Sequence, residues 1–362
     1  MENPQEIPFQ TVLTALLDPD TPLNPRYLYR LSDLADDDLS LLKDNWEQLP
    51  LWRRQALMED LEDLGAADDL LSFEAIGRHA VSDEDPKVRE LGVRVLWEFD
   101  GQDLIPIYLN LLDGDPEASV RAAAATGLGQ FVYFGELDEL PGERFRTIEK
   151  ALLRAIDQDE EPHVQQRALE SLSFASREEI PPLIEKAFES GDPDWIETAL
   201  VAMGRSMDDR WNESVLEMLD HASPALRAEA ARAAGEIEIS SAISQLVELT
   251  KDHDEDVRAA AIWSLSQIGG DRARWTLENL LTHAFEDEDI ELLESALDNL
   301  AFTEGMQAFA LFEISEDEDE DEYYDQLLED EDYLDYPEED DEDYGELPYI
   351  EDYDEDDEDL QD

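Results

Sequence analysis

Apolar and small residues recur along most of this chain in a fixed order that predicts helices. An apolar residue opens each of seven segments, Gly or Ala follows four residues later, and another apolar residue follows eight residues later. Offsets of 0, 4 and 8 place these side chains on one stripe of an α-helix. Successive opening residues lie 32, 44, 31, 31, 31 and 35 positions apart, which indicates a repeat. These anchor residues are Val88, Val120, Val164, Trp195, Leu226, Val257 and Leu292.

The residues before each anchor predict how its helix begins. Three positions ahead stands an acid or a serine, such as Asp85 or Ser223, and proline lies next to it in several segments. These residue types favour a helix N-terminus. A second amphipathic segment precedes each anchor, as residues 103–115 precede Val120, and strand-like alternation is nowhere sustained. Because one helical hairpin cannot bury its apolar face, the hairpins must stack. The sequence therefore predicts an all-α fold, an α-solenoid.

Particular phrases resemble those of a known repeat family. The turn-to-helix phrases DPKVR (85–89) and DEDVR (254–258), and the helix RAAAIWSLSQIGG (258–270), are similar to HEAT repeats. The similarity is greatest to the short bacterial type named after phycobilisome-lyase subunits. It covers roughly residues 70–305 and, more weakly, 36–69. The resemblance implies that the second helix of each pair lines a concave face, and that a turn acid pairs with an arginine of the next repeat.

An arginine directly follows the anchor in four repeats, where the helix dipole disfavours positive charge. A charge-assisted hydrogen bond to an acid of the adjacent repeat would more than offset this repulsion. We therefore expect a ladder in which each arginine reaches a neighbouring turn acid, with Arg258 directed toward the segment around Ser223 or Asp289. The alternative is a set of solvated arginines that contribute little. Gln165, Ile196 and Leu293 occupy this position in the other repeats. The arginines are Arg89, Arg121, Arg227 and Arg258.

The repeat pattern divides the chain into three expected regions. Residues 1–35 are rich in turn residues and form an N-terminal extension or cap. Residues 36–313 form the repeat solenoid. Residues 314–362 form an acidic, tyrosine-rich tail that we expect to be disordered, because self-repulsion and low aliphatic content oppose a packed core.

Three segments of the repeat region depart from the regular pattern. Residues 36–65 predict a degenerate first hairpin with Trp52 as its anchor, and residues 304–314 predict a final capping helix. The spacing of 44 marks an insertion at residues 132–146. This insertion is either a partner-binding element or a packed connecting loop.

The net charge of −72 restricts the partners of the chain. Residues 316–362 hold 29 Asp and Glu and no Lys or Arg, which leaves −43 for residues 1–315. Free nucleic acid and anionic membranes should be repelled, so electrostatics favours basic proteins and basic segments. A solubilising role or salt adaptation is the alternative. Acids alternate with seven tyrosines in the tail, which suits a basic groove or imitates a nucleic-acid strand.

The sequence contains no motif that predicts catalysis. Cysteine is absent, which excludes disulfides, thiolate metal sites and cysteine nucleophiles. Among the five histidines, His253 lies between acids, but a single histidine in an exposed turn is a weak metal ligand. HEAT-like deoxyhypusine hydroxylases build a di-iron centre from His-Glu pairs, and no such pair occurs here. We expect no cofactor and no metal. The N-terminus lacks a secretory signal and no stretch could span a membrane, so a cytoplasmic protein, monomeric by default, is expected.

These observations favour a non-enzymatic, protein-binding scaffold or adaptor whose acidic tail captures basic partners. Two alternatives stay open: a chaperone-like or nucleic-acid-mimicking regulator, and a subunit associated with a lyase or an oxidoreductase. Exposed aromatic residues often dominate binding surfaces, although each is also a candidate packing residue. The candidate contact residues are Trp97, Tyr133, Trp195, Trp263, Tyr323, Tyr324, Tyr333, Tyr336, Tyr344, Tyr349 and Tyr353.

Overall fold

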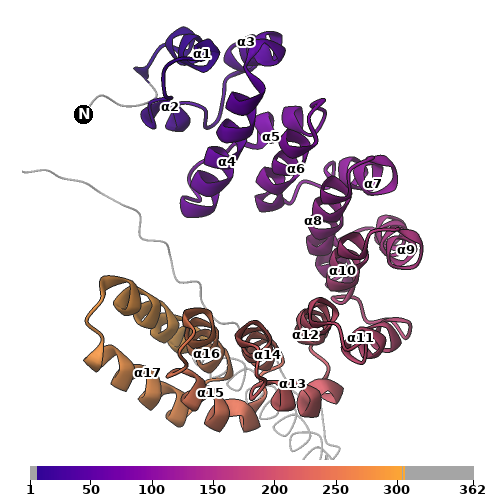
Figure 1. Cartoon of the computed structure of the whole chain (residues 1–362), viewed down its shortest axis with the longest axis vertical. Coiled ribbons are helices and arrows are strands. Elements are labelled where there is room, and N and C mark those ends of the chain that lie inside the picture. The colour runs from indigo at the N-terminus through magenta and orange to yellow at the C-terminus, as the bar shows by residue number, and fades with distance from the viewer. Residues whose placement is uncertain (1–5, 304, 306–362) are drawn as a thin grey trace, which may run out of the picture. The chain divides into compact units, whose positions relative to one another are not determined.

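The computed structural model describes residues 6–303 and 305, which fold as successive pairs of helices (Figure 1). The chain divides into a unit Met1–Glu304, described below, and a second unit Gly305–Asp362. Within residues 6–303 there is no β-strand, and none of the described helices is long and apolar enough to cross a membrane. The N-terminal helices are α1 (Phe9–Leu17), α2 (Arg26–Tyr29), α3 (Asp36–Asn45) and α4 (Leu51–Ala67).

The second helix of each later hairpin lies in an inner row, on the concave side of the curved stack in Figure 1. Consecutive inner helices pack against each other, so that α8 contacts α6 and α10, and α14 contacts α12 and α16. We call the solvent-facing side of these helices the inner wall. The inner helices are α6 (Pro86–Val95), α8 (Ala118–Glu136), α10 (Pro162–Leu172), α12 (Pro193–Ser206), α14 (Pro224–Glu236) and α16 (Glu255–Ile268).

The first helix of each hairpin lies in an outer row and packs against the inner helix that follows it, as α7 does on α8. Residues 287–303 are also helical and follow the last outer helix. This alternation of outer and inner helices is the α-solenoid that the sequence predicts. The outer helices are α5 (Glu74–Ala80), α7 (Ile105–Gly114), α9 (Gly142–Gln158), α11 (Ile180–Phe188), α13 (Asn212–Met218), α15 (Ile243–Leu249) and α17 (Asp271–His283).

The inner helices begin where the sequence places their N-cap residues. The Asp85 carboxylate accepts a hydrogen bond from the Val88 amide, and Asp254 accepts from the amides of Asp256 and Val257. These bonds satisfy backbone donors that a first helical turn leaves free. The N-cap side chains of α8, α10 and α14 make no such bond. Proline in the first turn of α10 and α14 favours helix initiation there instead.

The small residue four positions after each anchor lies in the core, as the pattern predicts. Ala124, Ala168, Ala199, Ala230 and Ala261 are each 0% exposed. In α6 this position is Gly92, and a Cβ added to it would lie 2.9 Å from the Cβ of Ala80 on α5. The small side chain therefore lets the two helices of one hairpin approach closely.

A second column of small residues lies nine positions after five of the anchors, and the repeat pattern described above does not include it. A Cβ on Gly235 would lie 2.9 Å from the Cα of Ser264, and one on Gly204 would lie 3.1 Å from the Cα of Ala233. Consecutive inner helices thus touch at this column. The residues are Gly129, Ser173, Gly204, Gly235 and Ser266.

The N-terminal segment packs onto the first hairpin and changes the register predicted there. Phe9 and Leu16 of α1 are buried in the same cluster as Leu57 of α4. Arg53 is 4% exposed because it donates hydrogen bonds to the carbonyl oxygens of residues 18 and 21, at 2.9 and 2.6 Å. Trp52 is 49% exposed, so its assignment as the anchor is wrong. Arg53 occupies that buried position instead.

The insertion at residues 132–146 extends two helices. α8 continues to Glu136, α9 begins at Gly142, and only a short turn separates them. The ring of Phe145 packs directly over Gly135, so the lengthened ends cover each other. The extra residues are therefore absorbed by longer helices, and no long connecting loop is present at residues 132–146.

Candidate functional site

Arginines that follow the anchors pair with aspartates of the next hairpin. In the pair on α8, Nε and Nη2 of Arg121 donate to the two carboxylate oxygens of Asp159 at 2.7 and 2.9 Å. Its Nη1 donates to the carbonyl oxygens of Asp115 and Pro116, in the turn before α8. Each such rung therefore joins a turn, an inner helix and the next hairpin. The three rungs of this kind are Arg89–Asp115, Arg121–Asp159 and Arg227–Asp252.

The aspartate in each rung lies two residues before the N-cap residue of the next inner helix. Asp159 Oδ1 also accepts from the Glu161 amide at 3.0 Å and closes the turn, as Asp252 Oδ1 does with the Asp254 amide. An aspartate two residues before the N-cap can accept a hydrogen bond from the turn amide and still accept hydrogen bonds from the arginine of the preceding hairpin. The N-cap side chain of Asp254 is used by its own helix, which explains why it is not the partner.

A further rung lies at the first seam and is the most buried. Arg54 Nη1 donates to Asp83 Oδ2 at 2.8 Å, and the two side chains are 5% and 0% exposed. The indole Nε1 of Trp46 donates to the same oxygen at 2.6 Å. The sequence pattern does not reveal this rung, because the residue at the anchor position of the first hairpin is Arg53 and not the apolar Trp52.

Three rungs, those of Asp115, Asp159 and Asp252, hold the pKa of their aspartates below the usual value. The hydrogen bond from Arg121 holds the pKa of Asp159 below its usual value, and the one from Arg227 does the same for the pKa of Asp252. Burial acts to raise the pKa of Asp115, but hydrogen bonds from Arg89 and the Glu117 amide outweigh it, and that pKa is also lowered. The carboxylates therefore stay charged through the neutral pH range.

Two consecutive positions of the ladder lack both the arginine and its acid. Gln165 donates only to the carbonyl oxygen of Asp159 in its own turn, at 2.7 Å, and Ser190 stands at the acid position of the next turn. In the following repeat Ile196 replaces the arginine and His221 replaces the acid. At each of these two positions of the ladder, both members of the Arg–Asp pair are therefore absent.

The prediction that Arg258 pairs with an acid of an adjacent repeat is wrong. Its Nη1 donates to the carbonyl oxygens of Asp252 and His253 at 3.1 and 3.3 Å, in its own turn. Within the described part of the chain, no carboxylate lies at ion-pair distance from this guanidinium, including those near Ser223 and Asp289.

Aromatic rings and a guanidinium form a row at the C-terminal ends of three inner helices. Tyr133 of α8 is 45% exposed, and its ring centre lies 5.8 Å from that of Phe174, directly after α10. The guanidinium of Arg205, on α12, lies 5.1 Å from the centre of the same Phe174 ring. Its Nη1 donates to the carbonyl oxygen of Glu170 at 3.0 Å. This row leaves one aromatic face accessible at Tyr133.

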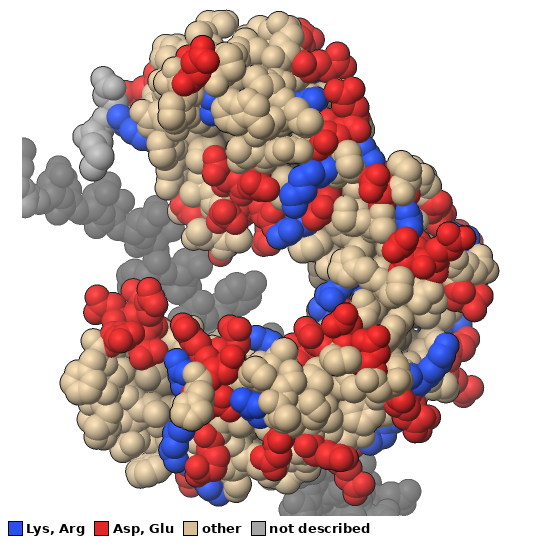
Figure 2. Space-filling model, viewed as in Figure 1, with Lys and Arg blue, Asp and Glu red and all other residues tan. Residues whose placement is uncertain are grey.

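Three carboxylates lie beside this row, where consecutive inner helices meet. Glu170 is 3% exposed and pairs with Arg167 at 2.7 Å, and Glu229 pairs with Arg232 at 2.9 Å. The side chain of Glu236 lies directly over Gly204. Burial raises the pKa of Glu170 and of Glu229, and it raises the pKa of Glu236 to about 7, against the opposing charge of Arg205. Figure 2 shows acidic and basic side chains interspersed around the concave side.

The candidate tryptophans differ in accessibility. Trp97 is half-buried and donates from Nε1 to the carbonyl oxygen of Ala123 at 3.2 Å. Trp195 is half-buried beside a cavity of about 280 Å³. Trp263 is 38% exposed, with its ring over Gly235. Of the candidates in the described residues, Tyr133 and Trp263 offer the most accessible surface. The seven tail tyrosines lie outside the described residues.

The described residues contain no metal-binding cluster. No group of three or more His, Asp or Glu side chains in positions 6–303 and 305 converges closely enough to hold an ion. His253 itself lies exposed in the turn before α16.

Comparison with known proteins identifies the repeat. A family profile described as HEAT repeats matches residues 74–142 and 212–301. It supports the repeat family and does not single out the phycobilisome-lyase type. None of the curated proteins compared with the sequence matches it.

Solved structures with a similar arrangement share little sequence with this chain. The Escherichia coli protein YibA is 19% identical, with a TM-score of 0.40, over 78% of this chain and 98% of YibA. Human deoxyhypusine hydroxylase in complex with glycerol is 17% identical, with a TM-score of 0.34, over 83% of this chain and 97% of that one. Importin beta is 12% identical, with a TM-score of 0.40, over 82% of this chain and 46% of that one.

Proposed function

This chain is a HEAT-repeat protein, and on that premise we propose that it is a protein-binding scaffold whose inner wall holds a basic segment of a partner. The inner helices present a curved surface built on helices that pack against each other. A surface on packed helices is more precise than one on loops, because its side chains are held by the core beneath them.

The observation that carries this proposal is the partly exposed ring of Tyr133, at one end of the row that continues through Phe174 to Arg205. An exposed aromatic ring next to carboxylates suits an arginine or lysine side chain, which stacks on the ring and pairs with an acid. Tyr133 supplies the accessible ring, and Glu136 lies one turn further along the same helix.

The charge of the chain supports a basic partner. Residues 1–315 carry a net charge of −43, and residues 316–362 add 29 acids without a base. A large net charge of one sign raises the association rate with an oppositely charged partner, and this increase in rate depends strongly on the salt concentration. We propose that the tail attracts the partner and that the inner wall then binds it.

Fluorescence anisotropy with a labelled peptide of alternating lysine and arginine tests both parts. Tyr133→Ala should weaken binding about tenfold, since a hot-spot aromatic contributes more than about 1 kcal/mol. Trp275→Ala is the matched control, because this 65% exposed ring lies on the outer helix α17 and should not affect binding. Deletion of residues 316–362 should lower the association rate and its salt dependence. Equal affinities for all four proteins would overturn the proposal.

Other measurements separate the alternative functions. A nucleic-acid-mimicking regulator would bind through the tail alone, so an isolated tail peptide would compete with DNA or RNA for the partner. A subunit associated with a lyase or an oxidoreductase would carry a chromophore or a metal, which an absorption spectrum and metal analysis of the purified protein detect.

A further inference from the structure

The hairpin α11–α12 has no Arg–Asp rung to either neighbour, and the contact that follows α16, where Arg258 bonds only to carbonyl oxygens of its own turn, also lacks one. We call the contact between consecutive hairpins a seam and name it by its two inner helices. Arg–Asp rungs bridge the seams α4–α6, α6–α8, α8–α10 and α14–α16. Among the described residues, no ion pair of this kind bridges α10–α12 or α12–α14.

The turns at these two seams keep their backbone conformation although they lack the acid. Ser190 Oγ accepts from the Asp192 amide at 3.1 Å, and His221 Nδ1 accepts from the Ser223 amide at 3.1 Å. Asp159 makes the same bond in a turn that carries a rung. The side chains at 190 and 221 therefore support the local turn, but they do not attach it to the preceding hairpin.

Cavities lie on both sides of α11. One of about 280 Å³, lined by Leu183, Ser190 and Trp195 among others, lies next to Gln165, where the first rung is missing. Another of about 690 Å³ lies between α11 and Trp211. Cavities of about 480 and 510 Å³ also flank α4, but there the Arg54–Asp83 pair bridges the seam.

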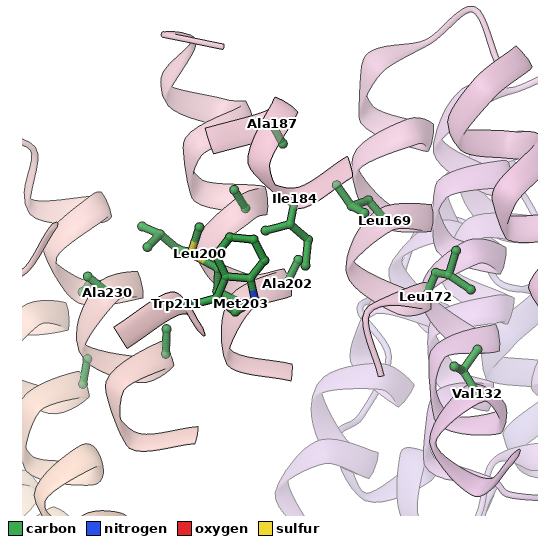
Figure 3. Close-up of a cluster of buried hydrophobic side chains, with 14 of the residues drawn as sticks. Val132, Leu169, Leu172, Ile184, Ala187, Leu200, Ala202, Met203, Trp211 and Ala230 are labelled. Carbon is green, nitrogen blue, oxygen red and sulfur yellow. The ribbon is translucent and has the colours of Figure 1, made fainter. Parts of the chain in front are cut away.

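Contacts between inner helices remain at the two seams, and Arg177, in the segment before α11, pairs with Glu149 of the outer helix α9 at 3.0 Å. Arg205 of α12 donates to the carbonyl oxygen of Glu170, and Thr198 donates to its carboxylate at 3.3 Å. Toward α14, Gly204 of α12 lies against Ala233. Figure 3 shows Leu200, Met203 and Trp211 in the apolar cluster that fills this region. These contacts hold the inner helices together, whereas no Arg–Asp rung attaches the turns at residues 190 and 221 to the preceding hairpins.

We infer that the hairpin α11–α12 is the flexure of this repeat stack. The inner contacts of α12 act as the pivot, and the cavities beside α11 give the outer helices room to move together or apart. Packed elements change their relation by small sliding and rotation at such seams. The curvature of the inner wall therefore changes at α10–α12 and α12–α14, while the segments on either side move as rigid bodies.

Double electron–electron resonance on the full-length chain measures this motion. The chain contains no cysteine, so introduced cysteines are unique attachment sites for nitroxide labels. The exposed pair Ser119→Cys and Glu255→Cys spans both seams without rungs. The exposed pair Glu47→Cys and Ser119→Cys spans only seams with rungs. We expect the distance distribution of the first pair to be at least twice as wide as that of the second.

Rung-restoring variants supply the decisive comparison. Gln165→Arg with Ser190→Asp, and Ile196→Arg with His221→Asp, introduce the residues that form rungs at the other seams. Together they should narrow the distribution of the 119/255 pair about twofold. The reverse exchange, Arg121→Gln with Asp159→Ser, should widen it further and keeps the inference testable if the restored variant does not fold. Equal widths for the two wild-type label pairs would overturn the inference, as would an unchanged width in both sets of variants.

Discussion

Arg121 on α8 and Asp159 in the turn before α10 are joined by two hydrogen bonds, and their side chains are only 16% and 11% exposed. A second pair links the same region in the outer row, where Arg154 of α9 meets Asp113 of α7 with side chains 50% and 51% exposed. The two pairs have similar partners and differ in burial. Burial decides how much each pair contributes, because solvent screens an exposed pair.

We expect Asp159→Ala to destabilise the stack by about 2 kcal/mol, because it leaves the Arg121 guanidinium half-satisfied at a buried seam. Asp113→Ala is the matched control and should cost less than about 0.5 kcal/mol. Urea denaturation followed by circular dichroism gives both midpoints. Equal shifts for the two variants would contradict a structural role for the rung.

The rungs should differ in strength in the order of their burial. The Arg54–Asp83 pair has side chains 5% and 0% exposed, whereas the Arg227–Asp252 pair has side chains 18% and 13% exposed. Removing one member of a buried pair costs about 3–5 kcal/mol, since the remaining charge is stranded. Asp83→Ala should therefore lower the urea midpoint more than Asp252→Ala does. The opposite order would show that burial does not govern these pairs.

The repeat itself was predictable because its cause is local. A helix buries one stripe, so an apolar anchor with Ala230 or Ala261 four residues later is visible in any single segment. The identity of the rung acid was not predictable in this way. Asp159 and Glu161 are both acidic turn residues, and only the turn geometry shows which carboxylate faces Arg121.

Other parts of the site depend on contacts between segments far apart in the sequence. Trp52 is an apolar residue with the spacing of an anchor. However, the carbonyl oxygens of residues 18 and 21 accept hydrogen bonds from the guanidinium of Arg53, and this residue is buried at the anchor position instead. Similarly, the raised pKa of Glu236 comes from burial against α12, which no pattern within α14 reveals. Sequence periodicity predicts the stack, and packing between hairpins determines its surface chemistry.

Gly235→Ala should destabilise the chain although alanine favours helix formation. An added Cβ would lie 2.8 Å from the Trp263 ring and 2.9 Å from the Cα of Ser264, so α14 and α16 would have to separate. Overpacking of this kind costs about 1–3 kcal/mol. Gly114→Ala is the control, because a Cβ there meets nothing within 4 Å. Thermal unfolding measures both variants, and Gly114→Ala should raise the stability by up to about 1 kcal/mol. Equal changes in stability for the two variants would contradict a close contact between α14 and α16 at Gly235.

Glu236→Gln should stabilise the chain at alkaline pH and have little effect at acidic pH. Burial raises the pKa of Glu236 from 4.5 to about 7 in the folded chain. Between these values the folded state binds a proton that the unfolded state has lost, so stability falls as pH rises through this window. Glutamine does not ionise and avoids the loss, which at about 1.4 kcal/mol per unit amounts to at most about 3 kcal/mol at pH 8. Urea midpoints at pH 4.5 and 8 measure the difference, with the exposed Glu213→Gln on the outer helix α13 as control. If Glu236→Gln changed both midpoints equally, ionisation of this carboxyl would not be the cause, and the inner wall would not change its charge near neutral pH.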